Sequence, residues 1–162
     1  MKMHLASLVD TKKLAVKIAK MAKFGDVIAL YGDLGAGKTA FAKFFIKELC
    51  GEEVEVPSPT FTLVQTYDAK NASLGEVAHF DFYRLKNPDE VVEIGFEEAL
   101  LSGVCLIEWA EKIGDYMPRD YLGIHLQNAE GDEGARNVEL KAYGSGWQDR
   151  LAAPELSERQ AL

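Results

Sequence analysis

A glycine-rich segment over residues 32–39 has the residue types and spacing of a phosphate-binding turn. It reads Gly32-Asp33-Leu34-Gly35-Ala36-Gly37-Lys38-Thr39 and matches G-x-x-x-x-G-K-[ST] at every constrained position. Glycines let the backbone turn tightly, so that successive N–H groups converge on an anion. Lys38 can reach the β- and γ-phosphates, and Thr39 offers a hydroxyl to Mg²⁺. The segment therefore predicts a site for a nucleoside triphosphate.

The residues on either side supply the strand and the helix that such a turn requires. The apolar run Val27–Tyr31 predicts a strand buried on both faces, and a helix is expected from Lys38 to Cys50, ending at Gly51. The N-terminus of this helix adds unpaired N–H donors and the positive end of the helix dipole. The alternative, a glycine-rich helix start with no ligand, explains the complete motif less well.

Two carboxylates are candidates to hold the metal ion that accompanies a triphosphate. Glu108 follows the apolar run of residues 104–107, and ligands of parallel sheets bind outside the carboxyl ends of the strands. We therefore expect Glu108 beside the turn, where it would orient Mg²⁺. Asp81 lies in the alternating segment 79–84 and is expected to hold a Mg²⁺-bound water or to align the attacking water. Each acid could instead be an ordinary exposed or paired residue.

Polar residues near these acids leave two interpretations open. Ser58 and Thr60 either contact the γ-phosphate or Mg²⁺, or form a rigid polar turn. Arg84 either stabilises charge on the transferred phosphoryl group or makes a surface ion pair. His79 is either a structural histidine, which is the commoner case, or a proton shuttle.

The remaining patterns predict an α/β domain. A helix capped by Asp10 and Thr11 comes first, and a helical stretch runs from residue 88 towards residue 101. Further strands are expected at residues 61–67, 76–83, 104–109, 121–126 and 138–142. The order of elements predicts a three-layer, P-loop NTPase-like fold with a mostly parallel central sheet and antiparallel edge strands. We expect one domain over residues 1–146 and a partly mobile C-terminal tail over residues 147–162.

Composition limits the classes of function. The formal net charge of −8 disfavours autonomous binding to DNA or RNA, because lysine and arginine supply most non-specific affinity for nucleic acids. No apolar run reaches the roughly 18 residues of a membrane span, and the N-terminus lacks a secretory signal. Cys50 and Cys105 have no histidines at metal-ligand spacing, and a disulfide is not expected. A cytoplasmic protein is the expectation.

Four motifs in order resemble one known family. They are the turn over residues 32–39, Ser58-Pro59-Thr60-Phe61-Thr62-Leu63-Val64, His79-Phe80-Asp81-Phe82-Tyr83-Arg84-Leu85 and Ile107-Glu108-Trp109. The chain resembles the TsaE (YjeE) family, the bacterial ATPases of tRNA threonylcarbamoyladenosine (t6A) biosynthesis. The resemblance covers roughly residues 11–111, with weaker agreement to about residue 136.

The resemblance implies a cytoplasmic ATPase that uses ATP and Mg²⁺ and acts with the TsaB and TsaD subunits. TsaD transfers the threonylcarbamoyl group, and the ATP cycle of TsaE supports turnover of that complex. Contact with tRNA is therefore expected only indirectly, through the complex, and contact with DNA or membranes is not expected.

The resemblance also implies roles for individual residues. Lys38, Asp81 and Glu108 are the catalytic candidates, and Thr39, Glu108 and Asp81 are the metal-site candidates. Nucleotide contacts are expected from the turn over residues 32–39 and from Ala40, Ser7, Thr11, Trp109, Glu111 and Arg136, with the stretch near Ser7 and Thr11 approaching the adenine. Family members often carry a Gly-Arg pair near Arg136, whereas this chain has Gly134-Ala135-Arg136.

Three other readings of the motifs are possible. A small P-loop kinase would phosphorylate a metabolite, but the arginines, at positions 84, 119, 136, 150 and 159, do not cluster as in an arginine-bearing lid. A GTPase would carry the guanine-reading Asn-Lys-x-Asp pattern, which is absent from the sequence. A nucleotide-gated binding module would hydrolyse ATP negligibly on its own, which overlaps with the family resemblance.

Overall fold

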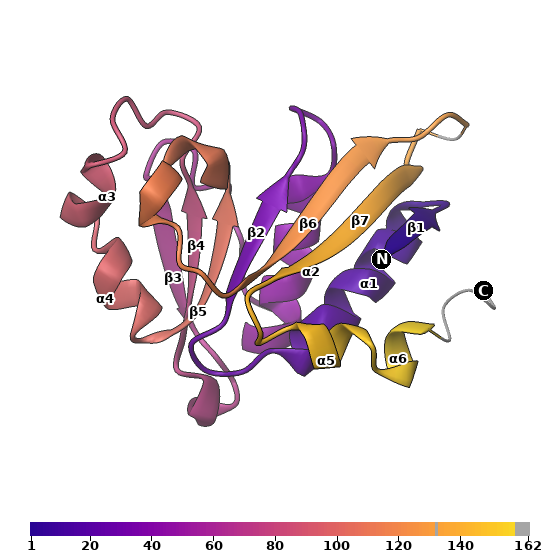
Figure 1. Cartoon of the computed structure of the whole chain (residues 1–162), viewed down its shortest axis with the longest axis horizontal. Coiled ribbons are helices and arrows are strands. Elements are labelled where there is room, and N and C mark those ends of the chain that lie inside the picture. The colour runs from indigo at the N-terminus through magenta and orange to yellow at the C-terminus, as the bar shows by residue number, and fades with distance from the viewer. Residues whose placement is uncertain (132, 158–162) are drawn as a thin grey trace.

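A mixed β-sheet forms the centre of the computed structural model, which describes residues 1–131 and 133–157 (Figure 1). Its strands are β1 (Lys2–Leu5), β2 (Val27–Tyr31), β3 (Val64–Asp68), β4 (Glu76–Asp81), β5 (Gly103–Glu108), β6 (Tyr121–Asn128) and β7 (Arg136–Tyr143). Their order in the sheet is β1-β7-β6-β2-β5-β4-β3. The central strands β6, β2, β5 and β4 pair in parallel. The outer pairs, β3 with β4, β6 with β7 and β7 with β1, are antiparallel.

Helices cover both faces of this sheet. They are α1 (Leu8–Met21), α2 (Lys38–Cys50), α3 (Glu90–Glu93), α4 (Phe96–Leu100), α5 (Gln148–Leu151) and α6 (Pro154–Ser157), with short 3₁₀ helices η1 (Ala72–Leu74), η2 (Ala110–Lys112) and η3 (Gly114–Tyr116). The buried hydrophobic residues form two clusters, one on each face of the sheet. The first contains side chains of α1 and α2, and the second contains side chains of α3, α4 and η2. The three-layer α/β architecture and its mostly parallel centre confirm the predicted fold class.

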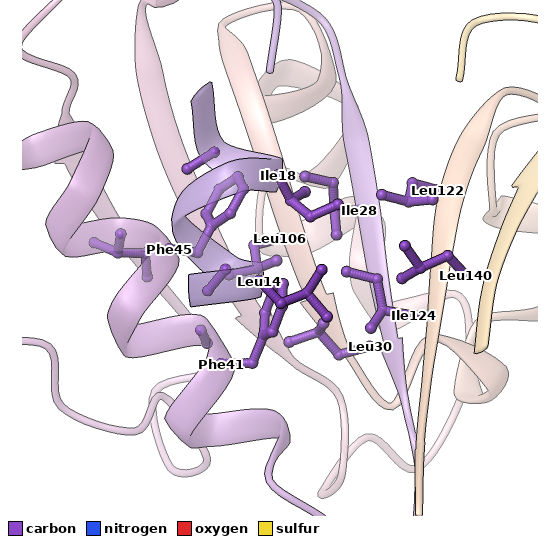
Figure 2. Packing of buried hydrophobic residues seen from close by; sticks show 14 of the residues in the cluster. Leu14, Ile18, Ile28, Leu30, Phe41, Phe45, Leu106, Leu122, Ile124 and Leu140 are labelled. Carbon is purple, nitrogen blue, oxygen red and sulfur yellow. The ribbon is translucent and has the colours of Figure 1, made fainter. Parts of the chain in front are cut away.

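The strand β2 shows why an apolar run lies in the middle of the sheet. Ile28 and Leu30 belong to the cluster with α1 and α2, whereas Val27 and Ala29 belong to the opposite cluster. Successive side chains of a strand point to opposite faces, so a strand covered on both sides must be apolar throughout. Figure 2 shows Ile28 and Leu30 packed with Leu14 and Ile18 of α1 and with Phe41 and Phe45 of α2.

The parallel centre brings the ends of distant segments to one edge. The strands β2, β4 and β5 point the same way in Figure 1, towards the loop that joins β2 to α2. In the β4–β5 register Asp81 lies opposite Glu108, and Leu30 of β2 lies opposite Glu108 on its other side. The topology therefore collects the phosphate turn (residues 32–39) and both candidate carboxylates at the same edge.

At the N-terminus the structure differs from the sequence prediction. Residues 2–5 form the edge strand β1, which was not predicted, because four residues give too short a pattern to distinguish from a loop. The predicted caps Asp10 and Thr11 are wrong. Ser7 caps α1 by accepting a hydrogen bond from the Asp10 N–H, at 3.4 Å, and Asp10 accepts one from the Ala6 N–H at 3.0 Å.

Two middle segments also depart from their predicted limits. The helical stretch towards residue 101 is interrupted at Gly95, which adopts a left-handed φ of 82° between α3 and α4. The strand expected from residue 61 begins at Val64, because the chain turns before it: Leu63 has a φ of 68° and its N–H donates to the Pro59 carbonyl. A left-handed leucine is not readable from apolar alternation.

Residues that follow β7 pack against the domain. Trp147, Leu151 and Leu156 are buried in the cluster that contains α1 and α2. Arg150 ties this segment to the loop before β2 through two hydrogen bonds to Asp26, at 2.6 and 2.9 Å. Residues 158–162, the end of the predicted mobile tail, lie outside the described residues. Among the helices that the structure describes, none combines the length and apolar character needed to cross a membrane.

Candidate nucleotide-binding site

Two glycines fix the shape of the phosphate turn. Gly32 has a φ of 145°, and a Cβ atom there would lie 2.4 Å from the Leu126 carbonyl oxygen of β6. Gly37 has a φ of 105° and is the N-cap residue of α2. L-residues with a side chain rarely adopt such angles, so both positions require glycine. The turn can therefore pass close to β6 and enter the helix without strain.

The start of α2 leaves its backbone donors available. Gly37 provides no side-chain cap, and no acidic residue lies in the first turn of the helix. The first N–H groups of an α-helix have no partner within the helix, and they attract anions together with the helix dipole. An anion held by the turn would meet these donors.

The side chain of Lys38 lies folded against the turn. Its ammonium group donates hydrogen bonds to the carbonyl oxygens of Gly32 and, at 3.3 Å, of Asp33. It also lies 3.8 Å from the ring centroid of Trp109, which adopts a left-handed φ of 60°. These contacts hold the cation at the mouth of the turn.

Burial and charge act on Lys38 in opposite directions. Lys38 is only 5% exposed, and this burial lowers the pKa of its ammonium group below the usual value. The carboxylates of Glu108, Glu111, Asp81 and Asp33 raise the pKa. Lys38 therefore lies where several negative groups act on it, among them Glu111, which the family resemblance implies as a nucleotide contact.

Thr39 and Glu108 meet across the two layers. The Thr39 hydroxyl, at the start of α2, donates a hydrogen bond to Glu108 Oε1 at 3.0 Å. The other oxygen, Oε2, lies 2.7 Å from Nε2 of His79 on β4. Glu108 is 1% exposed, and its carboxylate lies between the Thr39 hydroxyl of α2 and the His79 imidazole of β4.

Asp81 connects the same edge to the segment before β3. Its Oδ2 accepts a hydrogen bond from the Thr60 hydroxyl at 2.9 Å, and its Oδ1 accepts one from the Tyr83 N–H at 2.9 Å. The Ser58 hydroxyl lies 2.9 Å from that of Thr60. The segment around Thr60 is thus hydrogen-bonded to Asp81, a candidate catalytic carboxylate.

These side chains fit a magnesium ion shared with phosphate. Among the described residues, no group of three or more His, Cys, Asp or Glu side chains could hold a metal ion by itself. Mg²⁺ is usually bound by one or two carboxylates together with substrate phosphates and waters. The hydroxyl of Thr39 and the adjacent carboxylate of Glu108 supply such oxygen donors, and Asp81 lies opposite Glu108 in the register.

Arg136, at the start of β7, reaches the phosphate turn from a distant part of the sequence. Its Nε donates to the Ala36 carbonyl at 2.8 Å, and its Nη2 donates to the Gly35 carbonyl at 3.4 Å. Gly134, two residues earlier, lies against the start of α1, where a Cβ on it would be 3.2 Å from the Leu8 backbone nitrogen. The segment 134–136 thus contacts the phosphate turn through Arg136 and the start of α1 through Gly134.

The other predicted site residues are distributed around this centre. Ser7 caps α1, whereas the Thr11 side chain is buried within its first turn. Leu34 is exposed at the tip of the turn. Arg84 stacks on the Phe61 ring, with its guanidinium 4.1 Å from the centroid. Of the two interpretations left open for Arg84, the surface ion pair is therefore absent among the described residues.

Two contacts within the site cannot be predicted from the sequence. They are the contact between His79 and Glu108 and the hydrogen bond between Thr60 and Asp81. The alternation of residues 79–84 does put His79 and Asp81 on one face of a strand. The partner strand and its register, however, become visible only in the folded sheet.

A phosphate turn between a parallel strand and a helix, faced by a carboxylate from the neighbouring strand, defines the class of P-loop NTPase-like proteins. A family model described as "Threonylcarbamoyl adenosine biosynthesis protein TsaE" matches residues 5–138. The chain therefore belongs to the TsaE family.

Individual relatives agree with this assignment. A protein named "tRNA threonylcarbamoyladenosine biosynthesis protein TsaE" from Rickettsia felis is 46% identical over 91% of this chain and 84% of its own length. A protein of the same name from Bacillus subtilis is 38% identical over 94% of this chain and 91% of its own. The crystal structure of Bacillus subtilis YdiB has a TM-score of 0.73 at 34% identity, over 99% of this chain and 95% of that one.

Proposed function

We propose that this chain binds ATP with Mg²⁺ at the phosphate turn and hydrolyses it in the cytoplasm. The observation that carries this proposal is the convergence of Lys38, Thr39, Glu108 and Asp81 at one edge of the sheet. Thr39 and Glu108 are hydrogen-bonded at 3.0 Å, and Asp81 lies opposite Glu108 in the β4–β5 register.

The residues of the site have separate tasks in this proposal. The backbone N–H groups at the start of α2 bind the phosphates, and Lys38 exchanges the carbonyl oxygens of Gly32 and Asp33 for phosphate oxygens. Thr39 and Glu108 would hold Mg²⁺, which would neutralise charge on the phosphates. Asp81 accepts a hydrogen bond from the attacking water and orients it towards the γ-phosphate. Thr60, bonded to Asp81, couples the segment before β3 to this step.

We further propose that the ATP cycle supports t6A formation by the TsaB–TsaD pair. Membership of the TsaE family supports a role in threonylcarbamoyl adenosine biosynthesis. The net charge of −8 fits a subunit that meets tRNA only through partners with basic surfaces. The threonylcarbamoyl transfer itself would be carried out by TsaD.

Reconstitution tests this function. A tRNA-modifying extract that lacks its own TsaE is supplied with ATP, with or without this protein, and t6A is measured by mass spectrometry over several turnovers. We expect sustained t6A formation with the wild-type protein and none beyond the background with Lys38→Ala, because the phosphates lose their counter-charge. Equal t6A formation with both proteins would contradict the proposed role of ATP.

A further inference from the structure

The imidazole of His79 lies directly behind the Glu108 carboxylate and has no other described function. His79 Nε2 and Glu108 Oε2 are 2.7 Å apart, and the two side chains are 0% and 2% exposed. Thr39 occupies the other oxygen, Oε1, at 3.0 Å. The carboxylate is therefore held between a donor that belongs to the phosphate helix and a donor that belongs to the sheet.

The sheet register explains why His79 supports Glu108 without reaching the nucleotide. His79 is paired with Leu106, and Asp81 with Glu108, in the parallel β4–β5 ladder. Side chains two residues apart share a face, so His79 lies one step deeper in the sheet than the two carboxylates. A fully buried side chain at this depth can act on the site only through its neighbour.

Only one ring nitrogen of His79 can donate to Glu108. A carboxylate oxygen accepts hydrogen bonds, so the Nε2 atom that faces it carries the hydrogen. The other nitrogen, Nδ1, is buried and has no hydrogen-bond partner among the described residues. Among the described residues, Glu108 is therefore the only hydrogen-bond partner of the His79 ring, and the ring together with Thr39 orients the Glu108 carboxylate.

We propose that His79 is a positioning residue for the magnesium site, an inference that rests on the proposed ATPase function. The terminal torsion of a glutamate is broad, so an unsupported carboxylate samples several orientations. The hydrogen bond from Nε2 keeps Oε1 of Glu108 aimed at Thr39 and at the metal. Residues that orient metal ligands in this way typically change metal affinity or activity by 10- to 100-fold when mutated.

Two amide substitutions that differ only in reach test the proposal. In His79→Gln the side-chain nitrogen can take the place of Nε2, whereas the shorter His79→Asn places its nitrogen near the position of Nδ1. ATP affinity is measured by calorimetry over a series of Mg²⁺ concentrations and in EDTA. We expect His79→Asn to need roughly 10- to 100-fold more Mg²⁺ than wild type for the same affinity. His79→Gln should stay close to wild type, and both variants should keep the affinity measured in EDTA.

Several results would overturn the inference. One is the same Mg²⁺ requirement in the Gln and Asn variants, and another is a loss of EDTA-measured affinity that parallels the loss with Mg²⁺, which indicates general structural damage. A wild-type protein that binds no ATP would refute the proposed function itself. A wild-type protein that binds ATP while both variants behave alike would refute only the role of His79.

A measurement on the wild-type protein decides the case if His79→Asn does not fold. Long-range ¹H–¹⁵N spectra identify which ring nitrogen of His79 carries hydrogen. We expect hydrogen on Nε2, with a proton resonance that moves upfield in Glu108→Gln because the acceptor loses its charge. Hydrogen on Nδ1 alone would overturn the proposal, since Nε2 could not then donate to Glu108.

Discussion

At the scale of single residues, the site consists of charged and polar groups that are already paired with protein atoms. Lys38 contacts two carbonyl oxygens and the Trp109 ring, and Asp81 accepts hydrogen bonds from Thr60 and Tyr83. Buried charges need such partners, because an unpaired charge in a protein interior is costly. If a triphosphate binds as proposed, it must therefore replace some of these existing contacts.

The substitution Asp81→Asn separates binding from hydrolysis. It keeps the shape of the side chain but removes the negative charge that would orient the attacking water. We expect ATP turnover to fall by roughly 100-fold or more, a usual effect of losing a group that assists proton transfer. Affinity for ATP should change little.

A matched control comes from the partner of Asp81. Thr60→Val keeps the volume at that position and leaves the Asp81 carboxylate, so a much smaller loss of turnover is expected. Steady-state phosphate release and calorimetric ATP titration provide the two measurements. If Asp81→Asn retained wild-type turnover, Asp81 would be a structural residue that anchors the segment before β3.

The sequence alone predicted which residues lie together at this edge of the sheet. Lys38, Thr39 and Glu108 could be placed together because a motif and an apolar strand each point to the same sheet edge. The pairing of His79 with Glu108 could not be predicted, since it depends on the register between β4 and β5. Nor could the folded position of Lys38, because it depends on a left-handed Trp109.

At the scale of elements, β7 contacts the phosphate turn, which its sequence does not predict. Its first residue, Arg136, donates hydrogen bonds to the carbonyl oxygens of Ala36 and Gly35. These residues precede it by 100 and 101 positions in the sequence. An antiparallel strand that lies between β1 and β6 thus contacts the phosphate turn through its first side chain. Gly134, just before β7, lies against the start of α1. Periodicity predicted the strand, but its contact with the turn follows from the sheet order.

The substitution Arg136→Ala tests this bracing of the turn. Without the guanidinium, the Ala36 and Gly35 carbonyls lose their donors and the turn becomes less fixed. We expect ATP affinity to fall by about tenfold, equivalent to roughly 1.4 kcal/mol of binding free energy. Arg136→Lys should weaken binding almost as much, because a lysine retains the charge but not the geometry of the donors. Wild-type affinity in Arg136→Lys would instead indicate a direct charge contact with the nucleotide.

At the scale of the whole molecule, the segment after β7 completes the core. Trp147 is 2% exposed and belongs to the same cluster as α1, α2 and the centre of the sheet. The sequence of this segment does not predict its packing, because it is rich in Ala, Ser and Glu and its few apolar residues follow no clear helical or strand period. The fold class was predictable from the alternation of strands and helices, whereas the docking of this segment depends on tertiary contacts.

Trp147→Ala measures how much this docking contributes. Removing a buried tryptophan creates a cavity, and we expect the free energy of unfolding to fall by about 3–5 kcal/mol. Leu101→Ala is the control, because Leu101 is 80% exposed and its truncation should change stability little. Denaturant titrations followed by circular dichroism give both values. Equal stability of the two variants would show that the segment after β7 adds nothing to the domain.

The central claim is that the phosphate turn binds ATP together with Mg²⁺ through Lys38 and Glu108. Calorimetric titration of ATP into wild-type protein, Lys38→Ala and Glu108→Gln, each with Mg²⁺ and with EDTA, tests it most directly. We predict saturable binding by wild type that Mg²⁺ strengthens, loss of binding in Lys38→Ala, and a Glu108→Gln variant that binds ATP but no longer responds to Mg²⁺. Absence of binding by wild type, or undiminished Mg²⁺-dependent binding by Lys38→Ala, would contradict the claim.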